Sequence, residues 1–190
     1  MSKPVLTLMC GLPRCGKSTW IRKNKGDAVI VCPDDVRSSI LGHQFHKNAE
    51  DFVWAISKAM VRLLLEQKKD IIIDATNLTS TSRGDWIKIA NDYKAHIRIV
   101  WIKTSIKKCK ERNLKSKKGQ KLPSEVIDRM ALIFENPWYY KEKAKPEIEL
   151  IEIPKSRKSK STKERAFFEN YYRKEAIKDM LKPIKIVKGK

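Results

Sequence analysis

The 190-residue sequence contains no run of 18 consecutive apolar residues, so we expect no membrane-spanning segment. It has only four cysteines, and none of them forms a C-x-x-C pair, which argues against a zinc site. We therefore expect reduced thiols. The N-terminus leads directly into an apolar segment and leaves no room for a signal peptide. Together these absences favour a cytoplasmic protein, or one in the host cytoplasm if the chain is viral.

Acidic residues are scarce relative to basic ones. The 22 Asp and Glu are outnumbered by 42 Lys and Arg, which gives a formal net charge of +20. A field of this size attracts polyanions, so we expect nucleic acid, DNA or RNA, as a partner. A lysine-rich solvated surface is the competing interpretation, and a small neutral ligand would give no reason for such a charge.

Two of the seven glycines belong to the most informative motif of the chain. Residues 11–19 read GLPRCGKST and match the phosphate-binding pattern G-x-x-x-x-G-K-[ST]. The apolar run before them is typical of a buried strand, and the run after them can continue as a helix. Backbone N–H groups of the loop and the helix N-terminus would bind phosphates, Lys17 would reach the β- and γ-phosphates, and Ser18 would hold Mg²⁺. ATP and Mg²⁺ are the expected cofactors. The expected nucleotide-binding residues are Gly11, Arg14, Cys15, Gly16, Lys17, Ser18 and Thr19.

The order of elements predicts an α/β protein of the P-loop NTPase fold. Apolar segments alternate with segments of helical periodicity, which indicates a parallel five-stranded sheet flanked by helices. The expected strands are 5–10, 27–32, 70–74, 96–102 and 148–153. The phosphate loop, Asp34 and Asp74 all follow strands, at the edge of the sheet where such folds bind ligands.

The strongest amphipathic helix is expected over residues 49–67. Phe52, Ile56, Met60 and Leu63 recur at helical spacing, so this face is predicted to be buried in the core together with Trp54.

The composition changes at residue 155. We expect a kinase domain over residues 1–154 and a basic linker with a helical tail over 155–190. The latter segment holds 13 Lys and Arg and 4 Asp and Glu, with four aromatic residues clustered between 167 and 172. Such a basic C-terminal helical extension is suited to nucleic-acid binding, or its helix packs against the core.

Three features favour phosphoryl transfer to a hydroxyl group. Asp34 could accept the proton of an attacking alcohol, or it caps the following helix. Arg37, one helical turn later, could hold a phosphate, or it is solvated. Arg112 and the basic segment 115–121 resemble a lid over the triphosphate, or form a solvated loop. His43 and His46 lie in a loop on the acceptor side, where solvated polar residues are the simpler interpretation.

Three motifs carry a resemblance to a known family. They are residues 11–20, the Asp-Asp-x-Arg of residues 34–37 and the Asp-Ala-Thr-Asn of residues 74–77. In this order the chain resembles the kinase domain of phage-type polynucleotide 5′-hydroxyl kinase. The resemblance covers about residues 4–135 and departs from the family at Pro33, where the family has a basic residue.

The resemblance implies ATP-dependent phosphorylation of a 5′-hydroxyl end on DNA or RNA. By motif, it implies Asp34 as the general base, Arg37 as the acceptor-side arginine and Arg112 as a lid arginine, with Lys17 acting on phosphate. The expected substrate-binding residues are Asp35, Arg37, Thr76, Asn77 and Arg83. A homo-oligomer is a further expectation.

Other functions stay open from the sequence. They are a kinase acting on a hydroxymethylated base of phage DNA, a small-molecule or nucleoside kinase, and a non-catalytic, nucleotide-regulated RNA-binding P-loop protein.

Overall fold

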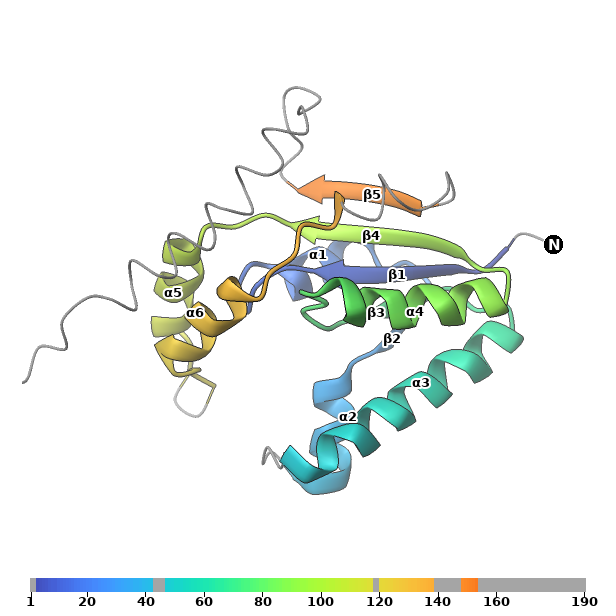
Figure 1. The fold of residues 1–190 in the computed structure, drawn as a ribbon, viewed down its shortest axis with the longest axis horizontal. Coiled ribbons are helices and arrows are strands. Elements are labelled where there is room, and N and C mark those ends of the chain that lie inside the picture. The colour runs from blue at the N-terminus through green and yellow to red at the C-terminus, as the bar shows by residue number, and fades with distance from the viewer. Residues whose placement is uncertain (1–2, 43–46, 118–119, 139–147, 154–190) are drawn as a thin grey trace, which may run out of the picture.

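Strands and helices alternate along the chain in the computed structural model (Figure 1), which describes residues 3–42, 47–117, 120–138 and 148–153. The strands are β1 (Val5–Cys10), β2 (Val29–Val31), β3 (Ile71–Ile73), β4 (His96–Ile102) and β5 (Ile148–Ile153). The helices are α1 (Lys17–Asn24), α2 (Pro33–Leu41), α3 (Glu50–Glu66), α4 (Ser80–Asp92), α5 (Ile106–Leu114) and α6 (Ser124–Leu132), and a 3₁₀ turn, Lys47–Ala49, precedes α3.

The five strands form one parallel sheet with the order β2-β3-β1-β4-β5. β1 is central, and Leu8 is in register with Ile73 of β3 on one side and Ile99 of β4 on the other. The predicted α/β class and five-stranded parallel sheet are therefore confirmed. The predicted tail 155–190, and the two histidines at 43 and 46, lie outside the described residues.

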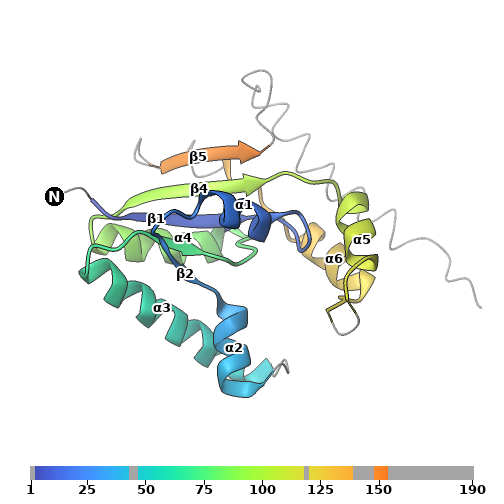
Figure 2. The same ribbon diagram turned by 180° about the vertical axis from the view of Figure 1, so that it is seen from behind.

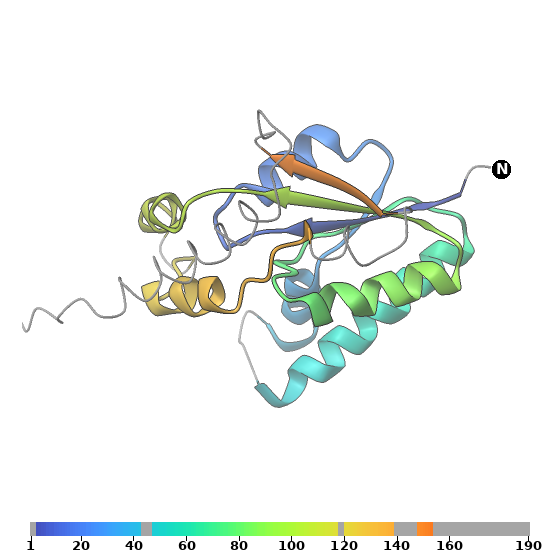
Figure 3. The ribbon, with the colours of Figure 1, turned by 45° about the horizontal axis from the view of Figure 1, so that its top comes forward.

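Helices cover both faces of this sheet. α3 and α4 pack side by side on one face, in front in Figure 1, and α1 lies on the other, in front in Figure 2. α5 and α6 lie together beyond the carboxyl ends of the strands, as Figure 3 also shows. Because both faces are covered, the central strands are continuously apolar, and Ile71, Ile72 and Ile73 are all buried. Among the described residues, no helix is long and apolar enough to cross a bilayer.

α3 buries a different face from the one predicted. The residues that pack inward are Val53, Ser57, Val61 and Leu65, whereas Phe52, Met60 and Leu63 are exposed. The helix carries two apolar stripes, and the one with the small Ser57 faces inward. Its hydroxyl is satisfied by the carbonyl of Val53 within the helix, so it is buried without an unpaired polar group. Trp54, which was predicted to be buried in the core, is only partly buried and packs against the core, with its ring 6.4 Å from that of Trp86.

Candidate active site

The phosphate loop connects β1 to α1 through two glycines that no other residue could replace without strain. Gly11 and Gly16 have φ angles of +144° and +119°. A Cβ atom at Gly11 would lie 2.8 Å from both the Ile102 carbonyl oxygen and the Cys15 Sγ. α1 begins directly after Gly16, without a side-chain cap and without an acidic residue in its first turn. Its first N–H groups are therefore available to an anion.

Lys17 lies over this loop. Its Nζ donates hydrogen bonds to the carbonyls of Gly11 and Leu12, both at 3.0 Å. The ammonium is thereby held where the phosphates of a nucleotide would lie. Cys15 lies beneath it as a buried thiol, and burial raises the pKa of that thiol above its ordinary value. Cys15 thus fills space as a neutral side chain.

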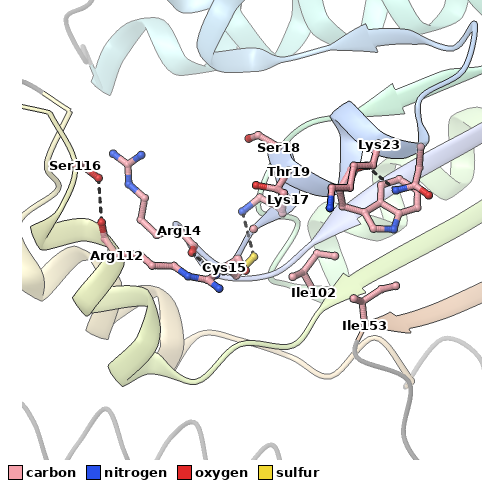
Figure 4. Close-up of a pocket in the computed structure, with 13 residues that line it drawn as sticks. Arg14, Cys15, Lys17, Ser18, Thr19, Lys23, Ile102, Arg112, Ser116 and Ile153 are labelled. Carbon is pink, nitrogen blue, oxygen red and sulfur yellow. Dashed lines mark hydrogen bonds between the residues drawn. The ribbon is translucent and has the colours of Figure 1, made fainter.

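A pocket of about 670 Å³ extends from the loop to α5 (Figure 4). Arg112 on α5 donates to two carbonyls of the phosphate loop, that of Cys15 at 2.7 Å and that of Arg14 at 3.1 Å. Arg14 in turn donates to the Gln120 carbonyl in the segment that follows α5. The residues that line the pocket are Arg14, Cys15, Gly16, Lys17, Ser18, Thr19, Trp20, Lys23, Asn24, Ile102, Arg112, Ser116 and Ile153. Arg112 and all the predicted nucleotide-binding residues except Gly11 therefore line one cationic pocket.

Asp74 lies at the carboxyl end of β3, directly after Ile73 and next to Ser18. Burial raises the pKa of its carboxyl above the ordinary value, whereas Lys17 and a hydrogen bond with Ser18 lower that pKa. A carboxylate beside a hydroxyl at this point is the oxygen donor set that Mg²⁺ takes in P-loop proteins. Asp74 was predicted from the sequence to lie at this edge of the sheet, without a role of its own. The sequence pattern that could have indicated a role in metal binding is an aspartate directly after a buried strand in a protein with a phosphate loop.

Asp34 lies in the first turn of α2, after the carboxyl end of β2. The N-cap of this helix is Cys32, so the expectation that Asp34 caps the helix is wrong. Its carboxylate is largely exposed and forms an ion pair with Arg37. Asp34 and Asp35 both act electrostatically on Asp74 and raise its pKa. They follow β2, which is the neighbour of β3 in the sheet.

Arg37 is held by a residue that the sequence analysis did not find. Its Nε and Nη2 donate to the two carboxylate oxygens of Glu50, at 2.6 and 2.8 Å. These bonds, more than the pairing with Asp34, raise the pKa of Arg37 above its ordinary value. Glu50 is the first residue of α3, so the contact joins α2 to α3 and fixes the guanidinium beside Asp34.

Two predicted substrate-binding residues are structural instead. Arg83 is fully buried and donates to the carbonyls of Asn77, Leu78 and Glu135 at 2.8 to 2.9 Å. Asn77 is buried as well, donates to the Met9 carbonyl and accepts from the Trp86 indole. Both side chains form their hydrogen bonds within the protein. Arg83 in particular binds carbonyls of the segment between β3 and α4, which belongs to no helix or strand. Thr76 is half-buried, and its carbonyl accepts from the N–H of Gly11 at 3.0 Å.

Replacing Arg83 by methionine is expected to destabilise the domain. Three buried carbonyls would lose a charged donor, at a cost of about 3 kcal/mol, which corresponds to a fall in Tm of roughly 10 °C for a domain of this size. Thermal unfolding followed by circular dichroism measures the change. Arg129→Met, on α6, is the matched control. An unchanged Tm would return Arg83 to the list of candidate ligand-binding residues.

A parallel sheet of order β2-β3-β1-β4-β5, with a phosphate loop after its central strand and an aspartate after β3, defines a P-loop kinase. The chain belongs to the AAA domain family, whose model matches residues 6–137.

Known proteins of this class are similar to the chain. It is 28% identical, over 140 residues, to L-seryl-tRNA(Sec) kinase from Methanococcus maripaludis; the match covers 70% of this chain and 53% of that protein. A structure of the Pnkp1/Rnl/Hen1 RNA repair complex is 26% identical with a TM-score of 0.62, covering 86% of this chain and 54% of that one. A structure of the Pnkp1/Rnl/Hen1 complex is 28% identical with a TM-score of 0.54, covering 59% of this chain and 40% of that one. The chain thus spans about half the length of these relatives, or less.

Proposed function

We propose that this P-loop kinase transfers the γ-phosphoryl group of ATP to a hydroxyl of a nucleic acid, most readily a 5′-hydroxyl end. The observation that carries the proposal is the position of Asp34. It is an exposed carboxylate, ion-paired with Arg37, and it follows β2, the neighbour of β3 in the sheet, as Asp74 follows β3. An exposed carboxylate at the carboxyl ends of the strands is suited to accept a proton from an acceptor hydroxyl.

The residues divide into donor-side and acceptor-side groups. On the donor side, the loop N–H groups and Lys17 bind the phosphates, while Ser18 and Asp74 would hold Mg²⁺. The metal, when bound, neutralises charge that develops on the transferring group. Arg112 and Arg14 lie above the loop and supply further positive charge to the phosphates.

On the acceptor side, Asp34 accepts the proton of the attacking hydroxyl while the oxygen of that hydroxyl forms a bond to the γ-phosphorus. The bond between that phosphorus and the bridging oxygen breaks, and ADP leaves. Arg37, which Glu50 holds in place, pairs with a phosphate of the acceptor. The nearest internucleotide phosphate of a 5′-hydroxyl end is such a group.

The charge of the chain and the named relatives support a nucleic acid as acceptor. A net charge of +20 suits a polyanion. One relative is named for phosphorylating seryl-tRNA, and another is part of an RNA repair complex. The similarity to seryl-tRNA kinase favours a second candidate, in which the acceptor is a hydroxyl of an aminoacyl group carried on tRNA.

The test is transfer of label from γ-³²P-ATP, in the presence of Mg²⁺, to a panel of acceptors. The panel contains 5′-hydroxyl DNA and RNA in single- and double-stranded form, DNA with 5-hydroxymethyluracil, and seryl-tRNA. Label at the 5′ ends of ordinary oligonucleotides supports the proposal, and label on seryl-tRNA alone supports the second candidate. Label confined to the modified base would keep nucleic acid as the acceptor but contradict the 5′-hydroxyl end, and no label on any acceptor while ATP still binds would contradict both candidates.

Replacing Glu50 by glutamine is expected to impair use of the acceptor. The uncharged glutamine amide has only one acceptor oxygen, so one of the two hydrogen bonds from Arg37 is lost and the other is weakened, and Arg37 is less well positioned. We expect KM for the acceptor to rise about 10-fold, equivalent to 1.4 kcal/mol, with KM for ATP unchanged. Steady-state kinetics with each substrate varied separately measures this split, and Glu66→Gln at the other end of α3 is the control. An equal rise in both KM values would mean that Glu50 supports the fold and not the acceptor site.

A further inference from the structure

The outward face of α3 carries a continuous apolar stripe that the fold leaves exposed. It consists of the exposed Phe52, Met60 and Leu63 and the half-buried Ile56, which we call the α3 stripe. The exposed fractions are 56% for Phe52 and 59% for Leu63. Figure 1 shows α3 at the outer edge of the molecule, with the sheet and α4 on its inner side. The stripe runs about 17 Å along the helix axis, and contiguous apolar surface of this kind marks an interaction site.

We propose that the α3 stripe is a homodimer interface, in which α3 packs antiparallel against α3 of a second copy. The inference does not depend on the proposed function.

The spacing of the stripe is self-complementary. Its members Phe52, Ile56 and Leu63, together with the exposed Ala59 beside Met60, are separated by four, three and four residues, the spacing of a helix-pairing seam. In an antiparallel pair related by a two-fold axis, Phe52 meets Leu63 of the second copy and Ile56 meets its Ala59. Bulky side chains thus face smaller ones at the centre, where the exposed alanine allows the helices to approach closely.

Charge selects the antiparallel orientation. Asp51 and Arg62 are 11 residues apart and therefore lie on the same flank of the helix, within about 20° of each other. Antiparallel pairing brings Asp51 of each copy next to Arg62 of the other, whereas parallel pairing would bring like charges together. Within the described residues, neither side chain forms an ion pair. This complementarity indicates a second copy of the chain as the occupant.

The interface is small. One pair of 17-residue helices lies near the lower limit for a specific interface, about 1,000 Å² of buried surface. We therefore expect a monomer–dimer equilibrium with Kd in the micromolar range.

Sedimentation velocity of the full chain from 1 to 200 μM tests the proposal. A dimer is expected to form in this range, and Leu63→Glu is expected to raise its Kd at least 100-fold without changing the circular dichroism melt. Leu114→Glu is the matched control, because Leu114 is also an exposed leucine but lies on α5. A monomer at every concentration would overturn the proposal, as would a dimer that Leu63→Glu leaves intact.

A charge swap tests the second copy and its orientation. Asp51→Arg and Arg62→Asp are each expected to raise the dimer Kd several-fold at low salt, and the double variant is expected to restore it. Failure of the double variant to restore association would overturn the antiparallel pairing. Single variants that leave the dimer Kd unchanged would overturn it as well.

Discussion

Replacing Lys17 by alanine is expected to reduce phosphoryl transfer about 1,000-fold while leaving the fold intact. The Lys17 ammonium lies over the phosphate loop, where it would stabilise the charge on the transferring group. The loss of one preorganised charge at such a position costs two to three orders of magnitude in rate. Its two present hydrogen bonds, to the carbonyls of Gly11 and Leu12, are partly exposed, so their loss should affect stability little.

Labelled-phosphate transfer under saturating ATP measures the effect. Circular dichroism and a melting curve establish that the variant is folded. Lys25→Ala is the matched control, because Lys25 is an exposed lysine just after α1. Turnover close to that of the unmodified protein would remove the phosphate loop from the mechanism and, with it, the assignment of the donor site.

Replacing Asp34 by asparagine is expected to lower kcat by at least about 100-fold, the typical contribution of a general base. Asparagine has nearly the same shape but cannot accept the hydroxyl proton. Because Asp34 is exposed and outside the residues that line the pocket around Arg14 and Arg112, ATP affinity should change less than about two-fold. A fall in kcat with constant ATP affinity is the signature of an interaction made in the transition state.

Two measurements separate this role from a structural one. Isothermal titration with ATP gives the affinity, and the melting temperature gives the stability. Asp27→Asn, in an exposed turn before β2, controls for the loss of a negative charge. If the Asp34 variant melts earlier but turns over normally, Asp34 serves to stabilise α2, and the base must be sought elsewhere.

The sheet and phosphate loop could be predicted because their determinants are local. Gly11 and Gly16 occupy backbone conformations that only glycine adopts easily, and they appear at a fixed spacing. Continuously apolar strands such as Ile71–Ile73 indicate a sheet that is covered on both faces.

The orientation of α3 could not be predicted, because its sequence carries two apolar stripes. Helical spacing shows that Phe52 and Leu63 share a face, and it shows the same for Val53 and Val61. Which face meets the sheet depends on the shape of the opposing elements, where a narrow residue such as Ser57 fits. Periodicity counts apolar residues and does not measure that fit.

In the candidate site, too, contacts between residues close in sequence could be predicted, whereas contacts between distant residues could not. Asp34 and Arg37 are one turn apart, so their pairing follows from helix geometry. Glu50 lies 13 residues beyond Arg37 on another helix, and no local pattern joins them. Arg83 was expected to bind substrate, and its burial depends on the carbonyls of Asn77, Leu78 and Glu135, which only the folded chain brings together.

The backbone around Glu135 has a mechanical consequence. Its N–H donates to the Leu78 carbonyl at 2.9 Å, its carbonyl accepts from Arg83, and its carboxylate accepts from the N–H of Ser80. The segment after α6 is thus fastened to the start of α4, which is itself packed on the sheet. The opposite end of the α5–α6 unit meets the phosphate loop through arginines that contact neutral carbonyls. Just before α5, the N–H of Lys103 donates to the Ile153 carbonyl and the Thr104 hydroxyl donates to the Cys15 carbonyl. The α5–α6 unit is therefore anchored at both ends, so we expect its arginines to adjust to a bound nucleotide while the two helices keep their place.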